Sequence, residues 1–288
     1  MTISELFQEC WNSHWNSPRY QLSGHAKEVQ NKYKNHIKPI FGGRDYLEIK
    51  RSEVRDWNNS MISMPVTANR SIEILSKLYK FAQDKEWTEG FNPCAAIKHF
   101  VEKKRRRYAS EREIKIITDI MDKYAVNHPV EMGFLYTLLY TGARPRSIER
   151  ARYDDLSEIE NDFGVLTFEG KSTEETGDLE SVILPPIIMA LIRNLPRRTD
   201  NLIFGIPLPS YLWRKIRKEA GSNDLWARDL RRTFATIGMS GGVKIDTIGE
   251  LLNHHSTTTT KRYALLNNKA RLEAVNQISN KLKSIIKK

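Results

Sequence analysis

The sequence predicts a mainly α-helical protein with one small β-sheet, divided into two domains. Its 288 residues are enough for about two domains of ordinary size. Apolar residues recur at helical spacing along much of the chain, whereas two short runs rich in β-branched and apolar residues lie between positions 164 and 185. We therefore expect a helical domain over 1–100, a basic linker over 101–109, and a mixed α/β domain over 110–288.

The charge of the chain points to a polyanionic partner. The formal net charge is +11, and clustered Lys and Arg residues gain free energy by displacing counterions from nucleic acid. A basic composition is also compatible with a protein that is charged for solubility or that binds acidic lipid. The positions of the Lys and Arg residues along the chain must distinguish these possibilities from nucleic-acid binding.

Other features of the sequence narrow the protein class. The apolar stretch over 132–143 is too short to span a bilayer, and the first ten residues lack a basic segment followed by an apolar one. Cys10 and Cys94 are too few for a disulfide framework or a zinc site and suggest a reducing compartment. We expect no membrane association, no secretory signal and no metal.

The first hundred residues are predicted to be helical. Thr2 and Glu5 have the spacing of a capping box at a helix start. A helical apolar stripe contains Ile72, Leu75, Tyr79 and Ala82, and the pattern breaks at the Asn-Pro pair over 92–93.

Five consecutive cations follow this domain and define the basic run of the linker. A run of this kind is typical of a solvated linker, a localisation signal or a segment that contacts DNA phosphates. Because it joins two basic domains, we interpret it as a DNA contact that lets both domains close around a duplex. Its members are Lys103, Lys104, Arg105, Arg106 and Arg107.

The second domain begins with a capping box at Ser110 and Glu113. A mostly apolar helix further on is expected to stop at Gly142. The segments GVLTFE and ESVILP, separated by the polar stretch GKSTEETGDL, predict a β-hairpin. Helices are expected to resume at Pro186.

Three distant segments carry the motifs with chemical meaning. They are TGARPRSIERARYDDL over 141–156, ARDLRRTFAT over 227–236 and LLNHHSTTTTKRY over 251–263. Together they resemble the Thr-Gly-x-Arg, His-x-Leu-Arg and Leu-Gly-His boxes of the tyrosine recombinases, or phage integrase family, whose nucleophilic tyrosine follows the last histidine by nine residues. The resemblance covers essentially the whole chain, weakly in its N-terminal half, and implies a helical core-binding domain followed by a tyrosine-recombinase catalytic domain.

The resemblance implies roles for individual residues. Arg144 and Arg231 align with the arginines that grip the scissile phosphate, His254 with the histidine of the third box, and Tyr263 with the nucleophile. Lys171 resembles the lysine of the family's β-turn. His255 is a lesser alternative to His254, and the ring of Tyr263 also suits a packed core position beside an apolar run.

The residue types suit phosphoryl transfer. Planar guanidinium groups donate paired hydrogen bonds to phosphate oxygens without losing their charge. A cationic pocket favours the phenolate form of a tyrosine, which is the reactive one. An ammonium group such as that of Lys171 can protonate the departing 5′-oxygen.

Three positions depart from the family pattern. Arg228 stands where the second box commonly has histidine; because arginine cannot act as a base, we expect it to serve as an electrostatic stabiliser. Ser147 replaces a glutamate that would help to orient Arg144. Asn253 replaces the glycine of the third box.

The resemblance implies a site-specific DNA recombinase that needs no cofactor. We expect the reaction to pass through a 3′-phosphotyrosyl intermediate and a Holliday junction, with double-stranded core sites as substrate. The protein is expected to act as a homotetramer on DNA, together with an accessory DNA-bending or directionality factor. Its expected location is the cytoplasm of a prokaryotic host, in association with the nucleoid. A type IB topoisomerase and a catalytically impaired DNA-binding descendant remain alternatives.

An apolar helical face over 272–285 needs a partner, which is either its own domain or a neighbouring protomer.

Overall fold

The structure, a computed structural model, describes residues 1–16, 25–103, 105–169, 179–253 and 268–287. The chain separates into two compact units, Met1–Arg105 and Arg106–Lys288. Each unit buries its own hydrophobic core.

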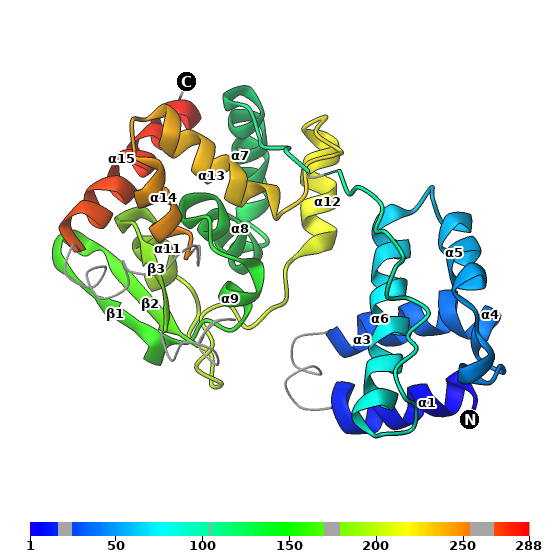
Figure 1. The fold of residues 1–288 in the computed structure, drawn as a ribbon. Coiled ribbons are helices and arrows are strands. Elements are labelled where there is room, and N and C mark those ends of the chain that lie inside the picture. The colour runs from blue at the N-terminus through cyan, green and yellow to red at the C-terminus, as the bar shows by residue number, and fades with distance from the viewer. Residues whose placement is uncertain (17–24, 104, 170–178, 254–267, 288) are drawn as a thin grey trace. The chain divides into compact units, whose positions relative to one another are not determined.

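Unit 1 is helical, as the sequence predicts. Its longest helix, α6, carries the predicted stripe: Ile72, Leu75, Tyr79 and Ala82 are all buried. The elements of unit 1, drawn from blue to cyan in Figure 1, are α1 (Ile3–Cys10), the π-helical turn η1 (Trp11–Trp15), α3 (His25–Lys32), the π-helical turn η2 (Tyr33–Ile37), α4 (Lys38–Phe41), the 3₁₀ turn η3 (Tyr46–Glu48), α5 (Arg51–Ser60) and α6 (Pro65–Asp84).

Side chains fix the ends and bends of these helices. The Thr2 hydroxyl accepts a hydrogen bond from the Glu5 backbone N–H, and the Glu5 carboxylate accepts one from the Thr2 N–H, which confirms the predicted capping box. Within η2 the backbone is wider than an α-helix, and the His36 carbonyl accepts a hydrogen bond from the Trp57 indole at 3.2 Å.

Unit 2 contains helices and one three-stranded sheet. The predicted hairpin is confirmed, because β2 and β3 pair antiparallel with Gly164 opposite Leu184 and Phe168 opposite Glu180. The elements are α7 (Glu111–Ala125), α8 (Pro129–Thr141), α9 (Pro145–Glu149), η4 (Tyr153–Asp155), β1 (Leu156–Glu158), η5 (Glu160–Asp162), β2 (Gly164–Phe168), β3 (Glu180–Leu184), α11 (Pro186–Arg193), α12 (Ser210–Glu219), α13 (Asp229–Ser240), α14 (Ile245–Leu251) and α15 (Asn268–Ile286).

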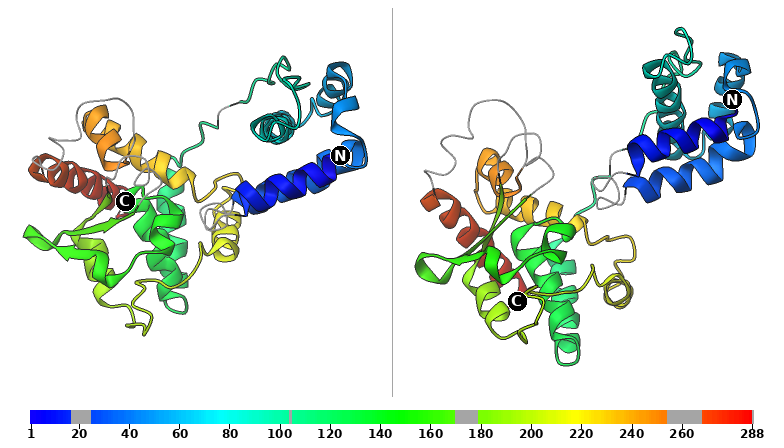
Figure 2. Two further views of the ribbon diagram at one scale, coloured as in Figure 1. Left: turned by 60° about the horizontal axis from the view of Figure 1, so that its bottom comes forward. Right: turned by 90° about the horizontal axis from the view of Figure 1, so that it is seen from below.

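Helix α8 lies at the centre of unit 2. Its residues are buried on nearly all sides, and α7, α11, α13 and β3 pack against it. The strand order is β1-β2-β3, and the sheet stays at the edge of the unit in the views of Figures 1 and 2. No helix of the described residues is both long enough and apolar enough to cross a membrane.

Helix α15 finds its apolar partner within its own unit. Val275, Ile278, Leu282 and Ile285 are buried in the core of unit 2, and the helix packs on α7, α13 and α14. This packing on the same chain corresponds to one of the two partners left open by the sequence.

Both cysteines are buried in unit 1. Burial raises the pKa of Cys10 and of Cys94 to about 12, so both thiols stay protonated and unreactive at neutral pH. Within the described part of the chain, His, Cys, Asp and Glu residues do not gather in groups of three or more that could hold a metal ion.

The start of α7 is tied to the end of the basic run. Ser110 and Glu113 form the predicted capping box, and Glu113 also accepts hydrogen bonds from Arg107 and from the Ser222 hydroxyl. Arg107 is further paired with Asp224 at 2.9 Å. Burial by itself raises the pKa of Glu113, but the hydrogen bonds from Arg107, Ser110 and Ser222 outweigh it and hold the pKa at about 2.

We expect Glu113→Gln to lower the free energy of unfolding by about 2 kcal/mol at pH 7, because several donors lose a charged acceptor. The folded pKa lies below the ordinary 4.5, so the stabilisation is complete above pH 4.5 and is lost as the pH falls toward 2. Urea unfolding from pH 7 to pH 2.5 measures the difference between the two proteins. Glu111→Gln, an exposed neighbour whose carboxylate lies 3.6 Å from Lys281, is the control; a constant difference over this pH range would contradict the prediction.

Candidate functional site

The first box forms a tight connection between α8 and α9. Gly142 ends α8 in the left-handed conformation, with φ of 63°, which a residue without a Cβ adopts at little cost. Arg144 follows in extended conformation at the N-cap of α9, and Pro145 starts that helix. The predicted helix end at Gly142 is confirmed, and it directs the chain so that Arg144 stands between two helices.

A buried carboxylate holds Arg144. The Nη1 of Arg144 donates a 2.9 Å hydrogen bond to the Oε2 of Glu180, the first residue of β3. The Glu180 side chain is 3% exposed, whereas that of Arg144 is 40% exposed. The guanidinium group is therefore anchored on its protein side and open on the other.

Arg231 joins the first box to the third. Its Nη1 donates to the Gly142 carbonyl at 2.9 Å, and its Nη2 donates to the Leu252 carbonyl. Arg231 lies in the first turn of α13, so one side chain fixes the end of α8 against the end of α14. The second box thus contacts Gly142 and Leu252, each of which lies two residues before a predicted site residue, Arg144 or His254.

Burial and a nearby positive charge act on Arg231. Burial is the larger cause and the charge of Arg144 the second, and together they lower the pKa of Arg231 to about 10, against a smaller opposite effect of Glu180. The guanidinium stays protonated at neutral pH. The two arginines are thus close enough to repel each other, and an anion between them would relieve that repulsion.

We expect Gly142→Ala to destabilise unit 2 by about 3 kcal/mol, from left-handed strain and overpacking together. A Cβ at position 142 would lie 2.7 Å from the Leu252 Cδ2 and 2.8 Å from the Phe234 ring. Gly221→Ala is the matched control, since Gly221 also has positive φ, 68°, but its Cβ would meet nothing within 4 Å. Urea unfolding should show a loss of about 1 kcal/mol for the control; equal losses would mean that the contacts at Gly142 carry no cost.

Arg228 lies on the surface at the N-cap of α13. Its guanidinium carbon stands 4.9 Å from the centre of the Trp226 ring, in a cation–π contact. Both side chains are exposed, so Arg228 is open to a ligand but takes no part in the contacts that join Arg144, Arg231 and Glu180.

The third box has a left-handed asparagine at its glycine position. Asn253 has φ of 49°, a conformation that asparagine tolerates better than most residues and that explains how it can replace glycine. Its side-chain Nδ2 donates to the Ser181 carbonyl at 2.8 Å. The third box is therefore tied through Asn253 to β3, next to Glu180.

Several predicted site residues lie outside the described part of the chain. They are Lys171, His254 with its alternative His255, and Tyr263. Of the basic run, Lys104 is also outside it, Lys103 and Arg106 are exposed, and Arg105 is half-buried. Arg107 is occupied by Glu113 and Asp224, which gives it a structural role in unit 2.

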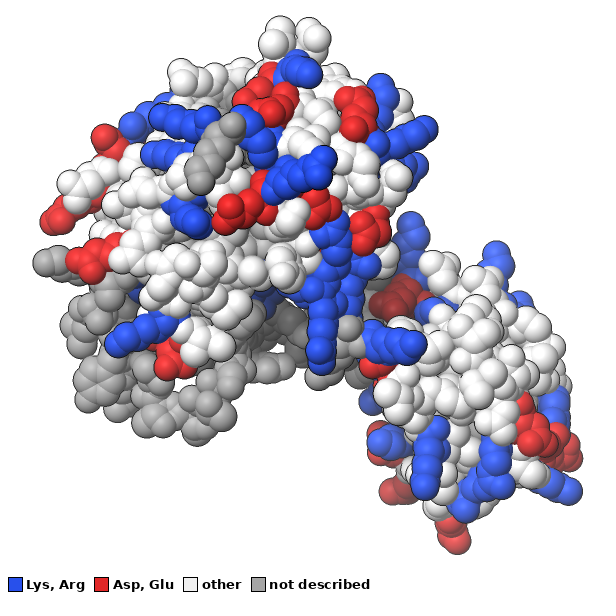
Figure 3. All heavy atoms as spheres, turned by 90° about the horizontal axis from the view of Figure 1, so that it is seen from above, with Lys and Arg blue, Asp and Glu red and all other residues white. Residues whose placement is uncertain are grey.

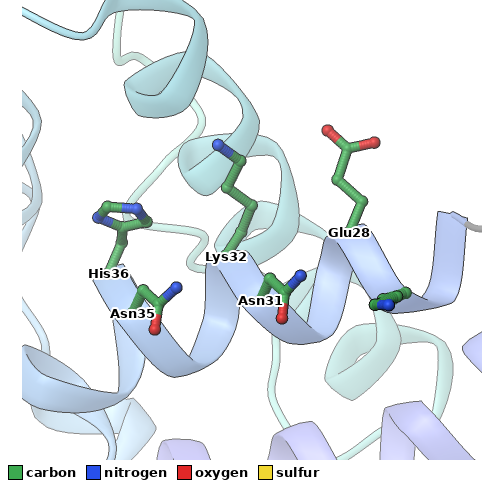
Figure 4. A pocket seen from close by; sticks show the side chains of 6 residues that line it. Glu28, Asn31, Lys32, Asn35 and His36 are labelled. Atoms are coloured by element: carbon green, nitrogen blue, oxygen red, sulfur yellow. The ribbon is translucent and has the colours of Figure 1, made fainter. Parts of the chain in front are cut away.

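Unit 1 presents a shallow polar hollow along α3 and η2. Its volume is about 430 Å³, and the amide side chains of Asn31 and Asn35 lie next to each other along the exposed side of the helix (Figure 4). The ammonium group of Lys32 donates to the Thr67 hydroxyl at 2.8 Å. In the view of Figure 3, Lys and Arg side chains are interspersed with Asp and Glu side chains on the surface of each unit. The hollow is lined by Lys27, Glu28, Asn31, Lys32, Asn35 and His36.

The sequence is similar to those of known recombinases. The model of the phage integrase family matches residues 209–270, a range that includes Arg231, His254 and Tyr263. The chain is 28% identical over 191 residues to tyrosine recombinase XerA of Pyrococcus furiosus, covering 62% of this chain and 63% of the relative. It is 28% identical over 170 residues to tyrosine recombinase XerD of Corynebacterium glutamicum, covering 54% of this chain and 55% of the relative. The matches thus span less than two thirds of either relative.

The fold is that of a solved DNA-bound integrase. A λ integrase dimer bound to a COC′ core site superposes with a TM-score of 0.65 at 16% identity, covering 89% of this chain and 96% of the other. The mainly α fold with a small sheet is therefore the tyrosine-recombinase fold.

Proposed function

We propose that this chain, which belongs to the tyrosine recombinase (phage integrase) family, is a site-specific DNA recombinase. It cleaves and rejoins duplex DNA through a 3′-phosphotyrosyl intermediate on Tyr263. Strand exchange proceeds in two steps through a Holliday junction.

One observation carries the proposal: the first and second boxes, distant in sequence, meet through Arg231. Its two hydrogen bonds, to Gly142 and Leu252, fix the guanidinium within charge range of Arg144. A guanidinium group has five N–H donors, and these bonds use two of them. Within the described part of the chain, both arginines therefore keep N–H groups that can donate hydrogen bonds to one anion between them. A phosphodiester is the anion that this pair fits best.

In the cleavage step, the Tyr263 oxygen attacks the phosphorus atom and the bond from phosphorus to the 5′-oxygen breaks. Arg144 and Arg231 stabilise the charge on the two nonbridging oxygens. Lys171 gives its proton to the departing 5′-oxygen, and His254 takes up or orients the phenol proton. Arg228, held over Trp226, adds positive potential and accepts no proton.

In the rejoining step, a 5′-hydroxyl from another duplex attacks the phosphotyrosine and releases Tyr263. One phosphodiester replaces another, so the reaction needs no ATP. Two such exchanges in succession pass through a Holliday junction and require four active sites on paired core sites, which is why we propose a homotetramer on DNA.

Unit 1 and the basic run supply binding to the duplex. Lys103, Lys104, Arg105 and Arg106 contact phosphates, while the polar hollow on α3 and η2 faces base edges. Asparagine pairs well with adenine in the major groove, and Asn31 and Asn35 are exposed there. Such a protein acts on chromosomal or mobile-element DNA in a prokaryotic cell, where a DNA-bending factor assists it.

The experiment uses nicked duplexes with randomised arms on both sides of the nick. The purified protein is mixed with this pool, SDS-resistant protein–DNA complexes are captured, and their DNA is sequenced. We expect covalent complexes linked to a 3′ end and enrichment of an inverted repeat. The enriched duplex is then tested for strand exchange with a second copy.

The other outcomes are distinct. Covalent complexes without any enriched sequence, accompanied by relaxation of a supercoiled plasmid, would indicate a topoisomerase. Enrichment by non-covalent capture alone, with no SDS-resistant complex, would indicate a DNA-binding protein that does not cleave. Either result would contradict the proposal.

A further inference from the structure

We propose that Glu180 is a positioning residue for the cleavage reaction. It supplies the carboxylate that orients Arg144, a task for which the family has a glutamate at the position of Ser147. This inference rests on the proposed function and names a residue that the three boxes do not contain. Glu180 acts through Arg144, by holding one edge of the guanidinium so that the other edge faces the scissile phosphate.

The burial of the ion pair is asymmetric. Glu180 is 3% exposed and Arg144 is 40% exposed. An ionised carboxylate is costly to bury unless it is paired, so Glu180 gains from keeping Arg144 in place. Because the partner is still open to solvent, the pair orients a group that remains available for binding, unlike an ion pair that is closed within a core.

The backbone on both sides of the carboxylate is fixed. Glu180 pairs with Phe168 in the β2–β3 ladder. The next residue, Ser181, accepts a hydrogen bond on its carbonyl from Asn253 at 2.8 Å and one on its hydroxyl from Arg271 at 3.0 Å. A carboxylate on such an anchored strand can hold a guanidinium within the narrow geometry that phosphoryl transfer needs.

The same strand connects the parts of the site. Through Glu180 it holds the first box, through Ser181 it holds the residue before His254, and through Arg271 it holds α15. Glu180 also opposes the mutual repulsion of Arg144 and Arg231, since its negative charge acts on both arginines.

The test measures single-turnover cleavage with Glu180→Gln and Glu180→Ala, using nicked duplexes with a 5′-bridging phosphorothiolate. Sulfur leaves without protonation, which keeps slow variants measurable. We expect a rate about 10- to 100-fold below wild type for both variants, with DNA affinity changed by less than about twofold. Glu158→Gln is the matched control, because Glu158 lies in the same sheet and pairs with Arg193 at 2.9 Å but is exposed; it should cleave at the wild-type rate.

A double-mutant cycle separates positioning from general support of the fold. If Glu180 acts through Arg144, Glu180→Ala has no further effect in the Arg144→Ala background. An equal effect in both backgrounds, or wild-type cleavage by Glu180→Gln, would overturn the inference while the proposed function stands. A wild-type protein that forms no covalent complex would instead remove the proposed function, and the positioning role with it.

Discussion

Tyr263→Phe should abolish the covalent protein–DNA complex, with a cleavage rate more than about 10⁴-fold below wild type. The substitution removes the single oxygen that the proposed mechanism uses as nucleophile, while it keeps the ring. Affinity for the enriched duplex should change by less than about twofold. Single-turnover trapping on nicked duplex and a filter-binding titration measure the two quantities.

Tyr211→Phe is the matched control for this experiment. Tyr211 is an exposed tyrosine of unit 2, on α12, and its loss should leave the trapping rate unchanged. Continued trapping by the Tyr263→Phe variant would assign the nucleophile to another residue.

Arg231→Ala should lower the cleavage rate by about 10³-fold or more. Removing one preorganised donor to a transition-state oxygen costs about 10²- to 10³-fold in many enzymes, and this change also frees the carbonyls of Gly142 and Leu252 from their shared partner. Arg231→Lys should recover little, because a single ammonium group cannot hold two carbonyls and still face a phosphate. Single-turnover trapping at saturating protein isolates the chemical step.

The neighbouring arginine provides the control. Arg232 pairs with Asp229 at 2.8 Å, and its side chain is 42% exposed, so Arg232→Ala should keep cleavage within about threefold of wild type. Equal losses for the two variants would mean that the effect comes from net charge on α13, and the special role of Arg231 would be wrong.

Local signals in the sequence were sufficient for much of the fold. Three kinds of signal depend on neighbouring residues only: the capping boxes at Thr2 and Ser110, the glycine that ends α8, and the two β-branched and apolar runs of the hairpin. β1 was not predicted, because Leu156–Glu158 is three residues long and gains its hydrogen bonds only by pairing with β2. The π-helical turn at Tyr33–Ile37 was also missed, since its His36 carbonyl is paired with the distant Trp57.

The site shows the same division between local and distant information. The resemblance of the boxes predicted roles for Arg144 and Arg231, but nothing near Glu180 in the sequence distinguishes it from an ordinary strand-end glutamate. Its role depends on a contact across 36 positions, with Arg144. Likewise, the basic run gave no sign that Arg107 would pair with Glu113 and Asp224.

In the proposed mechanism, Arg144, Arg231 and Tyr263 act on one phosphorus atom. The most direct measurement is a structure of the trapped covalent complex on the enriched duplex. We expect a phosphate bonded to the Tyr263 oxygen, with donors of both guanidinium groups within hydrogen-bonding distance of its nonbridging oxygens. A phosphate bonded to another residue, or bonded to Tyr263 with either arginine directed elsewhere, would contradict it.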